Sequence, residues 1–363
     1  MKKKLSALAL ALVLALSLCL TGCGGSDTLT LNVYNWGEYI SDGSDGSLDT
    51  IHAFEDWYES TYGQKVKVNY STYASNEDLY AKLKSGAVSY DVIIPSDYMI
   101  ARLKDEGMLQ PLNFDNIPNY QHIHEGFQGL YYDPDNQYSV PYTYGVVGII
   151  YDANQVDPAD AQGWDLMWNE KYAGKILQFN NSRDALGVAL KYLGYSYNTT
   201  DPAQITAATD LLIQQKPLVQ SYVMDEIFEK MQGNSAAIGA YYYGDYLTMA
   251  DVNPDLAFCL PKEGTNLYVD AMCIPKGAEN KANAEAFINF MCSTSVGLAN
   301  VEETWYSSPL LSVREELDPE VSEDPYAYPD DAVLEQCESF RNLPEDILAL
   351  YDSEWTRLKL AAN

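Results

Sequence analysis

Hydrophobic and polar positions alternate close to the start of the chain, in LTLNVYNW (residues 29–36). Leu29, Leu31 and Val33 fall on one side of the predicted strand and the residues between them on the other, which is typical of a strand with one buried face. The alternation stops in WGEY (36–39), where two large rings flank a carboxylate. This strand end needs an explanation beyond packing.

Strand-like and helix-like patterns then alternate along the first hundred residues. The predicted elements are a strand at 29–36, a helix at 48–62, a strand at 65–72, a helix at 76–84, a strand at 90–96 and a helix at 98–106. This order implies parallel strands joined by crossover helices. The centre of YDVIIPS (90–96) is continuously apolar, as expected for a strand that is covered on both faces.

The alternation resumes after a loop-rich stretch and predicts a second unit. Strands are expected at 138–152, 175–180, 236–242, 256–261 and 267–278, and helices at 183–193, 203–215, 224–231, 281–293 and over the C-terminal end at 331–359. Roughly 340 residues follow the N-terminal leader, which is more than one core usually holds. The sequence therefore predicts an α/β protein with two domains.

Residues 1–22 have the features of a secretory signal, with three lysines, an apolar run and LTGC ending at Cys23. LTGC resembles the lipobox of bacterial lipoproteins. This predicts a lipid on Cys23 and an extracytoplasmic protein that is anchored to the cell membrane by that lipid alone. Residues 23–26 would form a flexible tether. The alternative is an ordinary secreted protein with a chance cysteine at its cleavage site.

Acidic residues outnumber basic ones by 52 to 22, which gives a formal net charge of −30. Such a surface repels nucleic acid and attracts cations, although solubility alone would also account for it. The four cysteines beyond the leader form no close CxxC pair, and three lie in apolar stretches. Free buried thiols are the favoured interpretation, and export leaves a disulfide open, for Cys259, Cys273, Cys292 and Cys337.

Local motifs point to no metal, cofactor or catalytic site. His122 and His124 lack a third zinc ligand nearby, and DGSDGSLD (42–49) lacks the ordered ligands and terminal Glu of an EF-hand loop. No GxSxG, GxGxxG, HExxH or Walker sequence occurs. A pair of catalytic carboxylates would leave no local motif, so that possibility stays open.

Tyrosine is the unusual component, with 30 residues against 9 phenylalanines. A core built for packing alone would favour phenylalanine, because each buried phenol needs a hydrogen-bond partner. Several rings follow predicted strands, among them Trp36, Tyr39, Tyr98 and Tyr241. Ligands of open α/β sheets bind outside the carboxyl ends of strands. Each tyrosine alone is better explained as a core or surface residue, but together with nearby acids they predict an aromatic box with negative ends.

Such a box suits an elongated organic cation. Carboxylates would meet its ammonium groups with charge-assisted hydrogen bonds, because burying a bare charge is very unfavourable. Ring faces would hold the methylene groups and add about 0.5–2 kcal/mol for each cation–π contact.

Seven segments resemble, in the same order, the spermidine/putrescine-binding proteins of bacterial polyamine ABC importers: YNWGEY, VNYSTYASNEDLYAKLKSG, YDVIIPSDY, YSVPYTYG, KYLGYSYNTTDP, PKEGTNLYVDAMCIP and INFM. The resemblance implies the type II periplasmic-binding-protein fold. Two lobes, each a mixed and mostly parallel sheet flanked by helices, would close on the ligand about a two-crossover hinge. The implied lobes are 27–144 plus 269–308 and 145–268 plus 309–363. The expected protein is a monomer that delivers its ligand to an ABC permease and is not an enzyme.

The resemblance also assigns ligand contacts. WGEY supplies Trp36 and Tyr39 as ring walls and Glu38 as an amine acceptor, and Asp270 is the acid that binds an ammonium group. The further implied contacts are Ser96, Tyr98, Asn181, Asp184, Tyr241, Tyr268, Tyr306 and Arg341. Asn181 stands where the family has an acid, for which Asp225 is a candidate substitute, and Arg341 stands where some members have Gln.

These departures from the family pattern affect which polyamine the protein would bind. Spermidine is favoured over putrescine. Two other functions stay open at this point. One is a receptor for ferric ion or another small solute, in which tyrosinate and carboxylate oxygens would bind the metal. The other is a secreted glycoside hydrolase that uses a pair of carboxylates. Neither accounts for the ordered run of seven segments.

Overall fold

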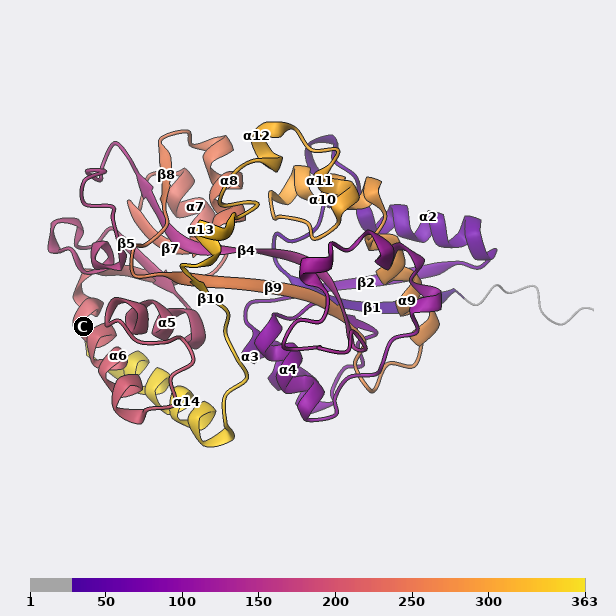
Figure 1. The fold of residues 1–363 in the computed structure, drawn as a ribbon, viewed down its shortest axis with the longest axis horizontal. Helices are drawn as coiled ribbons and strands as arrows, with labels where there is room; N and C mark the ends of the chain where they lie inside the picture. Colours follow the sequence, from indigo (N-terminus) through magenta and orange to yellow (C-terminus); the bar gives the residue numbers. More distant parts are fainter. Residues whose placement is uncertain (1–27, 363) are drawn as a thin grey trace, which may run out of the picture.

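The computed structural model describes residues 28–362, so the predicted leader, Cys23 and the tether lie outside the described residues (Figure 1). The chain begins with β1 (Leu29–Trp36), α2 (Thr50–Tyr62), β2 (Val66–Tyr73), α3 (Asn76–Ser85), β3 (Val92–Ile93) and α4 (Asp97–Asp105). β1 pairs in parallel with both β2 and β3. The predicted βαβαβ order and its parallel pairing are confirmed.

Local signals in the sequence account for the ends of these helices. The Asp49 carboxylate accepts a hydrogen bond from the His52 amide at the start of α2, and the Ser75 hydroxyl caps α3 in the same way. Both helices end at glycines with positive φ, Gly63 at 68° and Gly86 at 62°. Glycine adopts this left-handed conformation without steric cost, so the chain leaves each helix at these positions.

The second half of the fold starts with a long strand. Its elements are β4 (Ser139–Asp152), β5 (Ile176–Phe179), α5 (Ser182–Tyr192), α6 (Pro202–Gln215), β6 (Val219–Val223), α7 (Glu226–Gln232), β7 (Ile238–Tyr242), α8 (Tyr243–Val252) and β8 (Leu256–Cys259). The strands and helices predicted here are confirmed to within two residues at most ends. β6 and α8 were not predicted, and both follow the preceding element after a very short connection.

The chain then crosses between the halves again. The remaining elements are β9 (Thr265–Cys273), α9 (Lys281–Met291), α10 (Thr294–Thr304), α11 (Leu311–Arg314), α12 (Pro319–Ser322), α13 (Asp331–Leu334), β10 (Cys337–Glu338) and α14 (Glu345–Leu360). The prediction of helix throughout 331–359 was wrong for 335–344. There, Cys337 and Glu338 pair with β9, and Pro344 lies just before α14, where a new helix has to begin.

One mixed sheet runs through the molecule in the order β2-β1-β3-β9-β4-β7-β5-β6, with β8 paired to β4 and β10 to β9. β4 pairs antiparallel with β7, β8 and β9, and β9 also pairs antiparallel with β3. Figure 1 shows β4 and β9 running side by side between a half that contains β1 and β2 and a half that contains β5 and β7. These two strands therefore connect the halves.

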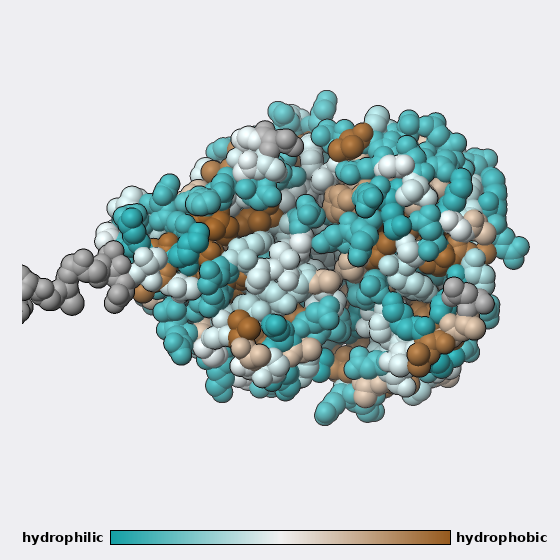
Figure 2. Space-filling model, turned by 180° about the vertical axis from the view of Figure 1, so that it is seen from behind, coloured by the Kyte–Doolittle hydropathy of each residue, from teal (hydrophilic) through white to brown (hydrophobic). Residues whose placement is uncertain are grey.

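The surface agrees with the acidic composition. Seen from behind, it is mainly hydrophilic, with small separate hydrophobic areas (Figure 2). Within residues 28–362, no helix is long and apolar enough to cross a membrane. The four described cysteines are free thiols, of which Cys273 and Cys292 are buried and Cys259 and Cys337 are half-buried.

Candidate functional site

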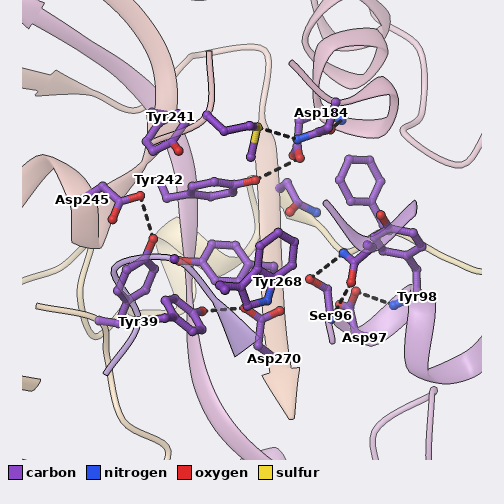
Figure 3. A pocket seen from close by; sticks show the side chains of 18 of the residues that line it. Tyr39, Ser96, Asp97, Tyr98, Asp184, Tyr241, Tyr242, Asp245, Tyr268 and Asp270 are labelled. Carbon is purple, nitrogen blue, oxygen red and sulfur yellow. Dashed lines mark hydrogen bonds between the residues drawn. The ribbon is translucent and has the colours of Figure 1, made fainter. Parts of the chain in front are cut away.

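A pocket lies between the two halves, and strand ends supply much of its wall (Figure 3). Trp36 ends β1, Ser96 follows β3, Asn181 follows β5 and Tyr242 ends β7. Eleven of the thirteen ligand contacts predicted from the sequence line this pocket: Trp36, Tyr39, Ser96, Tyr98, Asn181, Asp184, Asp225, Tyr241, Tyr268, Asp270 and Tyr306. The structure thus brings together residues that are up to 270 positions apart in the sequence.

Asp270, on β9, has one carboxylate oxygen that accepts a hydrogen bond and one that has no hydrogen-bond partner among the described residues. The Tyr39 hydroxyl donates to Asp270 Oδ2 at 2.5 Å and also lies 2.5 Å from the Thr143 hydroxyl. Oδ1 has no hydrogen-bond partner among the described residues, although Asp270 is only 3% exposed. Burial raises the pKa of Asp270 to about 6. This oxygen is therefore a buried acceptor that faces a pocket and lacks a donor.

A second carboxylate is placed by the start of α5. Asn181 caps this helix, and its Oδ1 accepts a hydrogen bond from the Asp184 amide at 2.8 Å. The Tyr242 hydroxyl donates to Asp184 Oδ2 at 3.0 Å. Burial raises the pKa of Asp184 as well. Asn181 therefore serves the helix end and orients Asp184 toward the pocket.

The pocket also contains three acids that were not predicted from the sequence. Asp245, on α8, is 5% exposed, and the Tyr306 hydroxyl donates to its Oδ2 at 2.7 Å. Burial raises the pKa of Asp245 well above its usual range. Glu77 and Asp97 also line the pocket. Asp245 lies three residues after the end of β7 at Tyr242, a position that a predicted α8 would have placed beside the pocket.

The rings form the wall between these acids. The Tyr39 and Tyr306 ring centroids are 4.5 Å apart at an interplanar angle of 74°, and those of Tyr242 and Tyr268 are 5.3 Å apart at 77°. Edge-to-face contacts of this kind hold rings in fixed orientations. The Tyr268 hydroxyl has no hydrogen-bond partner within residues 28–362, so it offers a further polar contact to a ligand.

One buried cation borders this acidic pocket. Arg183, on α5, is 2% exposed, and its guanidinium carbon lies 4.6 Å from the centre of the Tyr98 ring and 4.7 Å from that of Phe340. Burial raises the pKa of Glu77, and the charge of Arg183 opposes this rise. Tyr98 belongs to α4 in the other half, so Arg183 also forms a contact across the pocket.

Glu38 and Arg341 do not line the pocket. Glu38 is exposed beside it, at a φ of 46°, and partial burial together with the negative charge of Asp225 raises its pKa. Arg341 is exposed and stacks on the Tyr131 ring, with its guanidinium carbon 3.6 Å from the ring centre. Arg341 is not among the residues that line the pocket, so its positive charge does not oppose an amine there in this conformation.

The halves are close together in this structure. A Cβ atom added to Gly37 would lie 2.2 Å from Asp225 Oδ2, so Asp225 of one half packs directly against the backbone of the other. The pocket has a volume of about 50 Å³, which is space for little more than water. A larger ligand can enter only if the halves separate. Across residues 28–362, no three His, Cys, Asp or Glu side chains are grouped to hold a metal ion.

Similarity to known proteins defines the class. Residues 50–329 match the family described as bacterial extracellular solute-binding protein. The spermidine/putrescine-binding periplasmic protein of Salmonella typhimurium is 33% identical over 337 residues, which cover 92% of each chain. The chain belongs to the bacterial extracellular solute-binding proteins, a class that serves ABC transporters. Within it, the chain belongs to the family of spermidine/putrescine-binding proteins.

Solved structures support the same assignment. An ABC transporter protein of Listeria monocytogenes superposes with a TM-score of 0.84 at 34% identity and covers 92% of this chain and 100% of that one. The spermidine/putrescine ABC transporter substrate-binding protein of Streptococcus pneumoniae gives a TM-score of 0.74 at 35% identity, with 92% and 99% covered. The predicted periplasmic-binding-protein fold is confirmed.

Proposed function

We propose that this protein is an extracytoplasmic receptor that binds a polyamine between its two lobes and delivers it to an ABC permease. The observation that carries the proposal is Asp270 Oδ1, a buried carboxylate oxygen without a hydrogen-bond donor in a pocket lined by tyrosines. An ammonium group supplies both the missing hydrogen-bond donor and a positive charge that compensates the carboxylate. Relatives named for spermidine and putrescine binding support this choice of cation.

Each part of the polyamine has a matching part of the pocket. One ammonium donates to Asp270 Oδ1, while the Tyr39 hydroxyl holds Oδ2 in place. The methylene groups lie along the rings of Trp36, Tyr268 and Tyr306, which exclude water from them. The protein performs no chemistry on the ligand. Binding favours the closed arrangement of the lobes, and the permease recognises that form.

Spermidine is proposed as the preferred ligand over putrescine. The pocket contains six carboxylates, from Glu77, Asp97, Asp184, Asp225, Asp245 and Asp270. Arg183 offsets part of this negative charge. A triamine carries one more positive charge than a diamine and can engage one more carboxylate, so it relieves more of the desolvation that raises the pKa values of these acids.

We also propose the lobe boundaries and the anchor implied by the sequence. One lobe comprises 27–144 plus 269–308, and the other comprises 145–268 plus 309–363. Pocket residues such as Tyr39 and Asp270 would then belong to the first lobe, and Asp184 and Asp245 to the second. A lipid on Cys23, which lies outside the described residues, would hold the protein to the outer face of the membrane as a monomer.

Isothermal titration with spermidine and with putrescine tests the proposal. We expect one site, with a lower Kd for spermidine. Asp270→Asn should weaken binding at least a hundredfold, because an ammonium would lose its charged partner. Asp251→Asn, which changes an exposed acid on α8, is the control and should leave the Kd unchanged. The absence of binding to either amine would refute the proposal.

A further inference from the structure

A second cavity lies on the opposite face of β9 from the polyamine pocket. Successive residues of a strand point to opposite faces of the sheet. Asn266, Tyr268 and Asp270 line the polyamine pocket, whereas Leu267 and Val269 line the second cavity. We call this second space the rear cavity. It has a volume of about 290 Å³, against about 50 Å³ for the polyamine pocket in this conformation.

The wall of the rear cavity is largely aromatic. Its rings come from η4 (Glu125–Phe127), from the loop after it, from β4 and from the segment between α12 and α13, and they are Phe127, Tyr131, Tyr132, Tyr144 and Tyr328. The Phe127 and Tyr144 centroids are 4.3 Å apart, which fixes part of this wall. An apolar cavity of about 150 Å³ accommodates benzene. The rear cavity is therefore large enough for an aromatic ring with a short side chain.

Three residues of this wall carry buried polar atoms that have no hydrogen-bond partner among the described residues. They are Asp97 Oδ2 and the hydroxyls of Tyr132 and Tyr328, and each of these residues is at most 5% exposed. The nearby Tyr131 hydroxyl donates instead to the Phe340 carbonyl. Buried polar atoms in native proteins are almost always paired. A ligand in the rear cavity would supply the missing partners.

The charges around the cavity decide what kind of ligand fits. Asp97 is the carboxylate of its wall, and the same residue also lines the polyamine pocket, so it lies between the two spaces. The Arg314 guanidinium is already engaged, because it donates to the Ser322 carbonyl and lies 4.5 Å from the Tyr328 ring centre. His124, the other basic residue of the wall, is exposed. The chain as a whole has a net charge of −30, which favours cations over anions.

We propose that the rear cavity binds a small aromatic amine, with its ring among the tyrosines and its ammonium group against Asp97 Oδ2. The ring faces suit both parts of such a molecule, since they contact the aromatic ring and attract the cation. Leu311 and Leu334, which are 45% and 40% exposed, line the cavity and place its opening at the surface between α11 and α13.

Titration with 2-phenylethylamine and with 2-phenylethanol, its neutral counterpart of equal size, tests the proposal. We expect the amine to bind at least tenfold more tightly than the alcohol. Equal affinities would show that Asp97 does not select a cation, and absence of binding would show that the cavity holds only water. Either result overturns the proposal.

Two adjacent residues of β9 show which cavity is occupied. Leu267→Trp fills the rear cavity and should abolish binding of the amine, whereas Tyr268→Ala changes only the opposite face and should leave it within about threefold. The reverse result would place the amine in the polyamine pocket and refute the proposal. Leu334→Trp narrows the opening from an exposed position, so it gives the same test if Leu267→Trp does not fold. No polyamine is used, so a failure of this test can be told apart from a failure of the function proposed above, although Asp97 lines both spaces.

Discussion

Asp270 shows how a single residue can combine fixed geometry with an open binding position. Its Oδ2 is held by the Tyr39 hydroxyl and its Oδ1 is left for a ligand. Burial makes the ionised carboxylate unfavourable without a partner, so its pKa rises to about 6. An ammonium ligand reverses this effect. The ionisation of Asp270 and polyamine binding are therefore linked.

This linkage predicts a pH dependence of binding. Above pH 6 Asp270 is ionised and ready to accept an ammonium group. Below pH 6 a proton occupies the carboxylate and has to leave before the ligand binds, so the Kd for spermidine should rise about tenfold for each further pH unit. Titrations at pH 7.5, 6 and 5 measure this effect. A constant Kd over this range would show that Asp270 does not contact the amine.

Gly37 is a second residue at which the structure predicts an effect on binding, because Asp225 leaves no space for a side chain there. An added Cβ would lie 2.2 Å from Asp225 Oδ2, which is closer than any real contact. Gly37→Ala should therefore push the Asp225 carboxylate aside and raise the spermidine Kd a few-fold. The control is Gly277→Ala, since a Cβ at Gly277 has no atom within 4 Å. Equal affinities of the two variants would mean that the lobes bind ligand without approaching this closely.

At the scale of elements, the helix starts and strand ends position the site. α5 is an example, because the hydrogen bond by which the Asn181 side chain caps the helix is donated by the amide of Asp184, a pocket carboxylate. β9 is another, since its alternation supplies one wall to each of two cavities. The same short segments thus contribute to the stability of the fold and to binding.

Two substitutions at Asn181 separate these contributions. Asn181→Ala removes the cap and should lower stability by about 1 kcal/mol, with weaker binding because Asp184 loses its orientation. Asn181→Asp keeps the cap and adds a carboxylate to the pocket, so spermidine should bind several-fold more tightly. Thermal unfolding and titration of both variants measure the two effects. Weaker binding by Asn181→Asp would show that no amine lies near this helix start.

Much of the fold could be predicted because its signals are local. The alternation in β1, the cap at Ser75 and the glycine at Gly86 lie within a few residues of the features they determine. The same holds for the pocket residues of WGEY and YVDAM, which end or occupy predicted strands. Asp245 was missed because its place depends on α8, and Glu38 lies outside the pocket because the chain turns at Gly37 and Glu38, which leaves this side chain exposed. The alternation of hydrophobic and polar residues marks neither the start of a helix directly after a strand nor the direction of a turn.

At the scale of the whole molecule, the pocket concentrates negative charge that the fold must bury. The pKa values of Asp184, Asp225, Asp245 and Asp270 are all raised by burial. A carboxyl whose folded pKa lies above its unfolded value binds more protons when folded, so folding stability falls as pH rises through that interval. Without ligand, the buried carboxylates of the binding site therefore lower the folding stability of the protein at neutral pH.

The ligand-free protein should accordingly become more stable on mild acidification. Asp270 alone, with a pKa that moves from 3.8 to about 6, gives a gain of about 1.4 kcal/mol between pH 7.5 and pH 5. We expect a higher Tm at pH 5 than at pH 7.5, and a smaller difference in Asp270→Asn. With saturating spermidine the trend should reverse. A ligand-free Tm that falls between pH 7.5 and 5 would contradict this account.

The position of β9 in the sheet also has a consequence for how the chain folds. β9 pairs with β3 and β4, yet it follows β4 by more than a hundred residues in the sequence. Until residues 265–273 are present, both of those strands have an unpaired edge. Neither half of the molecule can therefore complete its part of the sheet before the ribosome has synthesised β9. Folding has to wait for a late segment, and contacts of such long range make it slow.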